Sequence, residues 1–264
     1  MVEVISTGIQ RLDHVLIEGK GIAAWSTVLI EGTSGAGKEL FAKQFAAAGV
    51  GPETVVYFST DESSEELVET YEHYNWPTDL RIVNIGTQFF EKVLSRDLQA
   101  SQYKQEGLAV SELRNVAAYG EGNVQSNFLS DMVYEICKLT APFRVTIDSL
   151  DFFLHFYPVN EVLSAMRTIK SYVSSNKGTA LFTISKGAHD VKIVSGLSAI
   201  ADVIIEMEAA RIASEFENRL IIKKIRNHPE KAVVLIYAIT EQGITPEMIT
   251  RVVYKNSQIA KRDI

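Results

Sequence analysis

Apolar and polar residues follow one another along the chain in blocks that predict alternating strands and helices. Short apolar runs rich in β-branched and aromatic residues predict buried strands at residues 27–30, 55–58, 81–85, 145–149, 179–184 and 203–207. Apolar residues at helical spacing predict helices after the first run and over residues 63–74, 127–138 and 161–173. This alternation is typical of an α/β fold, with a mainly parallel sheet covered by helices on both faces.

The end of the chain has a different pattern. Two apolar runs, residues 220–226 and 233–239, flank a polar turn at residues 227–230 and predict an antiparallel hairpin. Residues 86–125 mix charges with Gln, Ser and Gly, and there we expect a short helix and an exposed excursion. Because we find no repeat and no linker, we expect residues 1–264 to form one domain.

A glycine-rich turn separates the first predicted strand from the helix that follows it. It fits the phosphate-binding pattern G-x-x-x-x-G-K and consists of Gly32, Thr33, Ser34, Gly35, Ala36, Gly37 and Lys38. Glycines let the backbone curl so that successive N–H groups point at a phosphate chain, and the helix N-terminus adds its positive dipole end. Lys38 would reach the β- and γ-phosphates. The turn therefore predicts a nucleoside triphosphate site, the alternative being a glycine turn without a ligand.

The residue after Lys38 departs from this pattern. A Ser or Thr at that position places a hydroxyl on Mg²⁺, but this chain has Glu39. The glutamate could offer an oxygen to the metal, or it could turn outward toward solvent at the positive end of the helix. Both arrangements weaken the placement of Mg²⁺, so we expect hydrolysis to be slow.

Acidic residues follow two of the predicted strands. Asp148 ends the run at residues 145–149, where a carboxylate could hold Mg²⁺, and a helix cap or a turn is the alternative. Asp61 and Glu62 follow the run at residues 55–58, where a general base could orient the attacking water. We favour Glu62 as this base. The alternative is that one of the two acids caps the helix predicted over residues 63–74.

Composition narrows the class of protein. The net charge of −7 and the pI near 5.4 give no global basic surface for nucleic acid or an anionic membrane. Cys137 is the only cysteine, which excludes a disulfide, and no apolar run reaches the roughly 18 residues of a membrane span. We therefore expect a cytoplasmic protein without a membrane span, and the net charge disfavours a nucleic-acid partner.

Five segments, in the same order along the chain, resemble the KaiC-like branch of the RecA-type ATPases. They are ISTGIQRLDHVL, GTSGAGKELFAKQF, VVYFSTDESSEEL, VTIDSL and KKIRNHPEKAVVLIYAITEQGI. The third has Asp61-Glu62 where the family has two glutamates, and the last has Asn227 where the family has glycine. The resemblance spans nearly the whole chain except residues 86–125. It implies a RecA-like fold that binds ATP and Mg²⁺.

The resemblance also implies a homo-oligomer, with a hexameric ring as one form. In that assembly Lys224 and Arg226 would act in trans, reaching the γ-phosphate of the adjacent subunit; solvated charges on an edge strand are the alternative. Three functions stay open: an ATP-binding assembly or regulatory factor with weak or absent hydrolysis, an active ring-forming ATPase, and a DNA-binding recombinase paralogue. The sequence does not name a protein partner, and it does not separate ATP from GTP.

Overall fold

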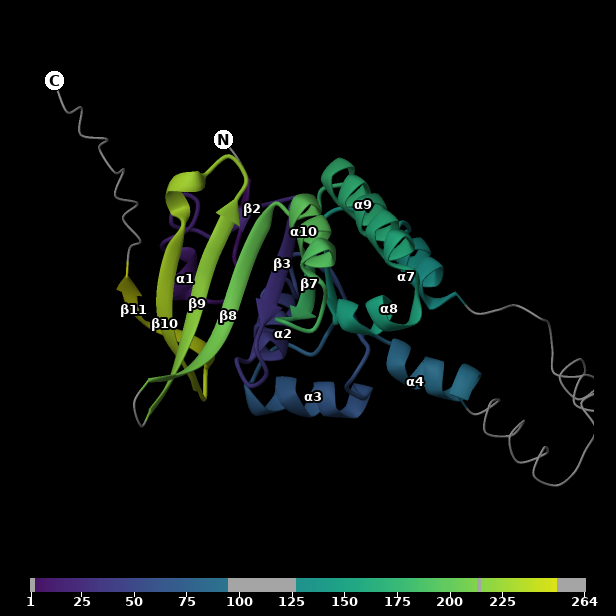
Figure 1. The fold of residues 1–264 in the computed structure, drawn as a ribbon, viewed down its shortest axis with the longest axis horizontal. Helices are drawn as coiled ribbons and strands as arrows, with labels where there is room; N and C mark the ends of the chain where they lie inside the picture. Colours follow the sequence, from purple (N-terminus) through teal and green to yellow (C-terminus); the bar gives the residue numbers. More distant parts are fainter. Residues whose placement is uncertain (1–2, 95–126, 213–214, 251–264) are drawn as a thin grey trace, which may run out of the picture.

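The computed structural model describes residues 3–94, 127–212 and 215–250, which fold around one large β-sheet (Figure 1). Within these residues nine strands pair in the order β11-β10-β9-β8-β3-β7-β6-β4-β5. They are β3 (Thr27–Gly32), β4 (Thr54–Ser59), β5 (Arg81–Asn84), β6 (Phe143–Asp148), β7 (Gly178–Ser185), β8 (Val203–Ile212), β9 (Glu215–Ile225), β10 (Val233–Thr240) and β11 (Gly243–Thr250). Two short strands, β1 (Val4–Ile5) and β2 (Ile22–Ala23), form a separate antiparallel pair.

The sheet is parallel in its larger part and antiparallel at one side. Strands β8, β3, β7, β6, β4 and β5 are parallel to one another, whereas the pairs β8–β9, β9–β10 and β10–β11 are antiparallel. The predicted RecA-like sheet with a C-terminal antiparallel hairpin is confirmed. Strand β11 extends that hairpin and was not predicted. Its Pro246 weakens the strand pattern, but it is tolerated because β11 lies at the edge of the sheet, where its register with β10 shifts.

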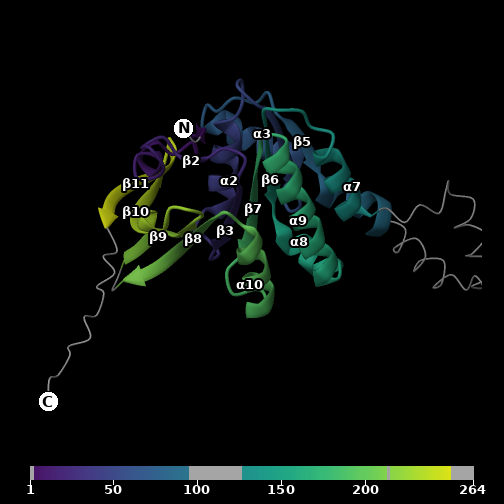
Figure 2. The same ribbon diagram turned by 90° about the horizontal axis from the view of Figure 1, so that it is seen from above.

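Helices cover both faces of the sheet (Figure 2). They are α1 (Gln10–Asp13), α2 (Lys38–Ala47), α3 (Ser64–His73), α4 (Ile85–Phe89), α7 (Phe128–Ile136), α8 (Leu150–Phe156), α9 (Val159–Ser175) and α10 (Val191–Ile200), with a π-helical turn at Phe90–Leu94 and a 3-10 turn at Pro229–Lys231. Phe45 of α2 and Ile30 of β3 belong to one apolar core. Ile169 of α9 and Leu29 of β3 belong to the other. Neighbouring residues of β3 thus face opposite cores, as expected for a central parallel strand.

Two helices were not predicted as such. Helix α8 contains most of the aromatic run at residues 152–157; there Phe153 is buried and Phe156 is 49% exposed. Helix α10 follows β7 after a short loop, and its N-cap Asp190 accepts a hydrogen bond from the Lys192 amide at 2.7 Å. Of the segment at residues 86–125, helix α4 and the turn after it are seen, and residues 95–125 lie outside the described residues.

The parallel strands bring the predicted chemistry to one edge of the sheet. Ser59 of β4 pairs with Asp148 of β6, and Gly32 of β3 pairs with Ser185 of β7, so the carboxyl ends of these strands are level. Ligands of open α/β sheets bind at this edge. Among the described helices, none is long and apolar enough to cross a membrane.

Candidate functional site

The phosphate loop (residues 32–38) joins the end of β3 to the start of α2. Gly35 and Gly37 have positive φ angles of 78° and 76°, a left-handed conformation that favours glycine. A Cβ atom at Gly32 would lie 2.8 Å from the Cβ of Lys38, so the close approach of the Lys38 side chain requires glycine there. Each glycine of the loop is therefore required, either by its positive φ angle or by the close approach of the Lys38 side chain.

The C-terminal strands hold the phosphate loop in place. The amide of Thr33 donates to the carbonyl oxygen of Met207 at 3.0 Å, and the amide of Ala209 donates to Thr33 Oγ1 at 3.0 Å. Tyr237 of β10 donates its hydroxyl hydrogen to the carbonyl oxygen of Ala36. Burial raises the pKa of Tyr237, so the phenol stays protonated and remains a donor at neutral pH. The loop is thus tied to both β8 and β10.

Lys38 and Glu39 form an ion pair at the start of α2. The Lys38 side chain is 9% exposed and the Glu39 side chain is 41% exposed. Lys38 lies where the motif predicts, folded over Gly32, but its ammonium contacts a carboxylate of its own chain. A phosphate group that binds Lys38 would therefore meet the Glu39 carboxylate at the same place.

Asp148 is buried at the end of β6 among hydroxyl groups. It accepts hydrogen bonds from Tyr57 at 2.7 Å and from Thr183 at 2.5 Å. Burial raises the pKa of Asp148; the two hydrogen bonds act in the opposite direction, and the charges of Glu39 and Glu62 add to the rise. Three acids thus lie at this edge of the sheet: Asp148 ends β6, Glu62 follows β4, and Glu39 lies at the start of α2.

Asp61 and Glu62 follow β4 directly, but they have different surroundings. The Asp61 Oδ2 atom accepts hydrogen bonds from Thr60 Oγ1 at 3.1 Å and from Ser149 Oγ at 3.5 Å. Both oxygens of Glu62 contact the ammonium of Lys43, at 2.8 Å (Oε1) and 2.6 Å (Oε2). The acid favoured as general base is therefore bound to a lysine of α2.

Neither acid caps helix α3. The N-cap is Ser63, and its partner in a capping box is Glu66, which accepts a hydrogen bond from the Ser63 amide at 2.8 Å. That hydrogen bond lowers the pKa of Glu66. The alternative reading of Asp61 and Glu62 as helix caps is therefore wrong.

The donor set at this edge fits a metal ion only together with a nucleotide. No group of three or more His, Cys, Asp or Glu side chains is arranged to hold a metal within the described parts of the chain. Asp148 and Glu39 are hard oxygen donors of the kind Mg²⁺ prefers, and Mg²⁺ is commonly held by one or two carboxylates plus substrate phosphates. Asp148 and Glu39 could thus hold Mg²⁺ with the phosphates as the remaining ligands.

Lys224 and Arg226 lie at the other edge of the sheet. Lys224 pairs with Ile204 near the start of β8, and Arg226 lies just beyond the end of β9. Since β8 is parallel to β3, this end of the sheet is opposite the phosphate loop. The two side chains therefore cannot reach the phosphate loop of their own chain.

Both side chains contact the end of α10 or the segment after it. Lys224 Nζ donates to the carbonyl oxygens of Ser198 at 2.9 Å and Ala201 at 2.7 Å. Burial lowers the pKa of Lys224, and the charge of Arg226 acts in the same direction. Arg226 pairs with Asp202 at 2.6 Å, and its side chain is 50% exposed.

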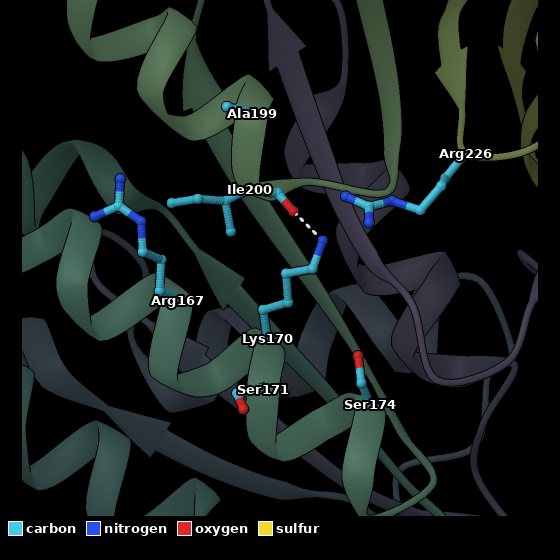
Figure 3. A pocket seen from close by; sticks show the side chains of 7 residues that line it. All are labelled: Arg167, Lys170, Ser171, Ser174, Ala199, Ile200 and Arg226. Carbon is cyan, nitrogen blue, oxygen red and sulfur yellow. Dashed lines mark hydrogen bonds between the residues drawn. The ribbon is translucent and has the colours of Figure 1, made fainter.

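A basic pocket of about 440 Å³ lies beside Arg226 (Figure 3). Its lining consists of Arg167, Lys170, Ser171, Ser174, Ala199, Ile200 and Arg226. Lys170 is paired with Asp202 at 2.8 Å, so one carboxylate balances part of the positive charge. The pocket belongs to the edge of Lys224 and Arg226, away from the phosphate loop.

Three residues that shape the site were missed in the sequence. Tyr57 and Thr183 lie inside strands, where nothing in the pattern separates a hydrogen-bond donor to Asp148 from an ordinary core residue. Lys43 gave a detectable signal, because it is the one charge in the apolar run of residues 40–48, in which residues 41–47 are all buried. A lysine at such a position needs a nearby counter-ion.

Known proteins resemble this chain over most of its length. Residues 5–248 match the family model described as "ATPase: KaiC". The chain is 25% identical to the circadian clock oscillator protein KaiC of Synechococcus elongatus over 244 residues, which are 90% of this chain and 41% of that protein. It is 26% identical to the UPF0273 protein MJ1359 of Methanocaldococcus jannaschii over 247 residues, which are 91% of this chain and 94% of that protein. The chain thus spans about two fifths of the length of its KaiC relatives. With the phosphate loop, the strand-end acids and the RecA-like sheet in place, the chain belongs to the KaiC family of RecA-type ATPases.

Proposed function

We propose that this protein binds ATP and serves as a nucleotide-dependent assembly or regulatory factor whose hydrolysis is weak or absent. The observation that carries the proposal is the ion pair between Lys38 and Glu39 at the start of α2. In this proposal residues 32–39 bind the nucleotide, Asp148 and Glu39 hold Mg²⁺, and Asp61 or Glu62 orients the water.

Weak hydrolysis follows from the chemistry of phosphoryl transfer. The reaction depends on positioning and on electrostatic stabilisation, part of which Mg²⁺ supplies when it is bound. Glu39 stands where a neutral hydroxyl would tie the metal to the loop, and its carboxylate is engaged with Lys38. The carboxylate also adds a negative charge beside phosphates that already repel one another. We therefore expect Glu39 to slow hydrolysis more than it weakens nucleotide binding.

Assembly is the second part of the proposal. Lys224 and Arg226 lie at the edge opposite their own phosphate loop, so a role at the γ-phosphate would require a neighbouring copy of the chain. Arg226 is half exposed beside the basic pocket, which supports its availability to such a neighbour. Lys224 would first have to give up part of its hydrogen bonding to the end of α10. We therefore propose Arg226, rather than Lys224, as the main contact to the γ-phosphate of a neighbouring subunit.

An active ring-forming ATPase is the alternative, and the retained strand-end acids Asp61, Glu62 and Asp148 favour it. A DNA-binding role has less support. Lys186, in the loop after β7, is paired with Glu206 at 2.8 Å and also with Glu208, which neutralises a cation that could face a phosphate backbone. We further treat residues 1–264 as one nucleotide-binding domain and place the protein in the cytoplasm, with an unidentified protein partner.

The nucleotide occupancy of the purified protein tests the proposal. Protein prepared with and without Mg²⁺ is denatured, and the released nucleotide is identified and counted, with ATP and GTP compared as competitors. We expect ATP or ADP to be bound in both preparations, because the phosphate loop and Lys38 do not depend on the metal. Protein that carries no nucleotide, and takes none up from millimolar ATP in either preparation, would contradict the proposal.

A further inference from the structure

Lys43 is a buried lysine that contacts the candidate general base. It lies on α2, five positions after Lys38, in a stretch of the helix, residues 41–47, in which every residue is buried. Its side chain is 6% exposed, and its ammonium lies 2.6 Å and 2.8 Å from the two oxygens of Glu62. Its backbone carbonyl accepts a hydrogen bond from Tyr71 at 3.1 Å, which fixes this part of α2 against α3.

This ion pair is persistent for a physical reason. A buried ammonium is very costly unless it keeps a counter-ion, and removing one partner of a buried ion pair strongly destabilises a protein. Among the described residues, Glu62 is the carboxylate within ion-pair distance of Lys43. Glu62 cannot leave Lys43 without leaving that positive charge unpaired.

The neighbouring acid is in the opposite situation. Asp61 is exposed, its Oδ2 atom contacts the hydroxyl groups of Thr60 and Ser149, and no ion pair to it is found within the described part of the chain. Both acids lie at the edge that holds Asp148: Ser59, which pairs with Asp148 across the sheet, donates to the carbonyl oxygen of Glu62 at 2.7 Å, and Ser149 donates to Asp61 at 3.5 Å. Two adjacent carboxylates thus share one edge, but only Glu62 has its charge neutralised.

We propose that Lys43 is a positioning residue that withholds Glu62 from the chemistry and leaves Asp61 to orient the attacking water. The inference rests on the proposed function, since it concerns hydrolysis at the same site. In that step the water oxygen bonds to the γ-phosphorus, and the bond from the γ-phosphorus to the bridging oxygen breaks. ADP keeps the electron pair of that bond, and the proton of the water passes to the Asp61 carboxylate. Lys43 therefore adds to Glu39 as a second reason for slow turnover.

The test uses Glu39→Thr as the background, so that turnover is high enough to compare. Lys43→Met is added because methionine fills a similar volume without the charge, and Glu62, already partly exposed, then faces water. We expect kcat to rise roughly tenfold with KM little changed, since a positioned general base contributes at least that much. Adding Glu62→Gln to this variant should remove the gain, and Lys43→Arg in place of Lys43→Met should keep kcat low because arginine retains the ion pair.

The matched control is Arg81→Met in the Glu39→Thr background. Arg81 pairs with Glu135 at 2.8 Å on the surface away from the phosphate loop, so breaking this pair should leave kcat unchanged. A kcat that stays level or falls with Lys43→Met, or a gain that survives Glu62→Gln, would overturn the inference. A purely structural role of the ion pair predicts those results.

A fluorescent-nucleotide titration of each variant separates two kinds of failure. If the variants bind ATP with similar Kd values and Lys43→Met does not raise kcat, the inference about Lys43 is wrong and the proposed function stands. If the wild-type protein binds no nucleotide, the proposed function is wrong and the inference falls with it. Thermal unfolding of each variant verifies that the fold is retained.

Discussion

The ammonium of Lys38 is paired with the carboxylate of Glu39, the next residue on the same helix. A lysine of a phosphate loop ordinarily neutralises the charge of a bound nucleotide, and here a side chain of the same loop contacts it in the free protein. Binding of a triphosphate must therefore replace one anion by another at Lys38. The same exchange of anions at Lys38 therefore affects both nucleotide binding and turnover.

Lys38→Ala should abolish measurable nucleotide binding and leave the fold intact. Hydrogen bonds to charged groups contribute about 1.5–3 kcal/mol each, and Lys38 would make such bonds to the phosphates. A fluorescent-nucleotide titration measures the loss, and circular dichroism verifies the fold. Lys138→Ala removes an exposed lysine paired with Glu135 and is the control. Equal affinities for the wild type and Lys38→Ala would refute the assignment.

Glu39→Thr should speed hydrolysis at least several-fold. Two like charges about 4 Å apart at an effective dielectric of about 20 repel by roughly 4 kcal/mol, less what Lys38 or Mg²⁺ screens. Threonine removes this repulsion and restores a neutral metal ligand. Glu39→Gln removes the charge without restoring the hydroxyl, so steady-state ATPase assays of both variants separate the two effects. Brisk, Mg²⁺-dependent wild-type activity that Glu39→Thr leaves unchanged would show the reading to be wrong.

Asp148→Asn should make stability less dependent on pH. The pKa of Asp148 in the folded protein is raised above the ordinary value of 3.8, chiefly by burial, so the folded state holds this proton more tightly than the unfolded chain. The contribution of Asp148 to stability therefore falls as pH rises from 3.8 through its folded pKa. The free energy of unfolding of Asp148→Asn, relative to wild type, should increase over that range and then level off.

Urea unfolding without nucleotide, at pH values from about 4 to about 8, measures the effect. The control is Asp79→Asn, because Asp79 is exposed and its replacement should give a curve parallel to that of the wild type. A parallel curve for Asp148→Asn as well would mean that Asp148 ionises in the folded protein as easily as in the unfolded chain.

Assembly should strengthen with nucleotide. If Arg226 reaches a phosphate bound to a neighbouring copy, the nucleotide joins the two subunits, and ligand and association are linked by mass action. Light scattering should then show a larger mass with ATP and Mg²⁺ than without them, and Arg226→Gln should reduce the difference. Arg81→Gln is the control. A monomer at high protein concentration, with ATP and Mg²⁺ present, would exclude the trans arrangement.

Tyr237→Phe should weaken nucleotide binding without changing the residues that would touch the ligand. The lost hydrogen bond to the Ala36 carbonyl oxygen would contribute about 0.5–1.5 kcal/mol, which corresponds to a Kd increase of roughly two- to tenfold. The same fluorescent titration measures it. Tyr74→Phe serves as the control, and an unchanged Kd for Tyr237→Phe would mean that the loop keeps its conformation without this bond.

Much of the fold could be predicted because its signals are local. The glycines of the phosphate loop and the apolar strand before it each lie within a few residues. Strand β11 was missed because Pro246 interrupts its pattern, and its partner β10 had to be placed before an edge strand could be inferred.

Most individual residues of the site could be predicted, but the contacts between their side chains could not. Glu39 was recognised as an unusual residue, yet its ion pair with Lys38 depends on side-chain rotation at the helix start. Lys43 and Glu62 are 19 positions apart and meet only because α2 packs beside the turn after β4. Likewise, Lys224 contacts the end of α10 across a distance in sequence that no periodicity encodes.

Strands β9 and β10 form one continuous ribbon with an end at each edge of the sheet. At one end Tyr237 holds Ala36 of the phosphate loop, and at the other end lie Lys224 and Arg226. In an assembled ring the ribbon of each subunit would thus touch its own nucleotide site at one end and its neighbour's at the other. If the chain assembles in this way, the antiparallel ribbon links the two nucleotide sites that it touches, and a ligand bound at one site would change the affinity of the other. Filling of the ring with nucleotide would then be cooperative, with the antiparallel ribbon as the element that carries the coupling.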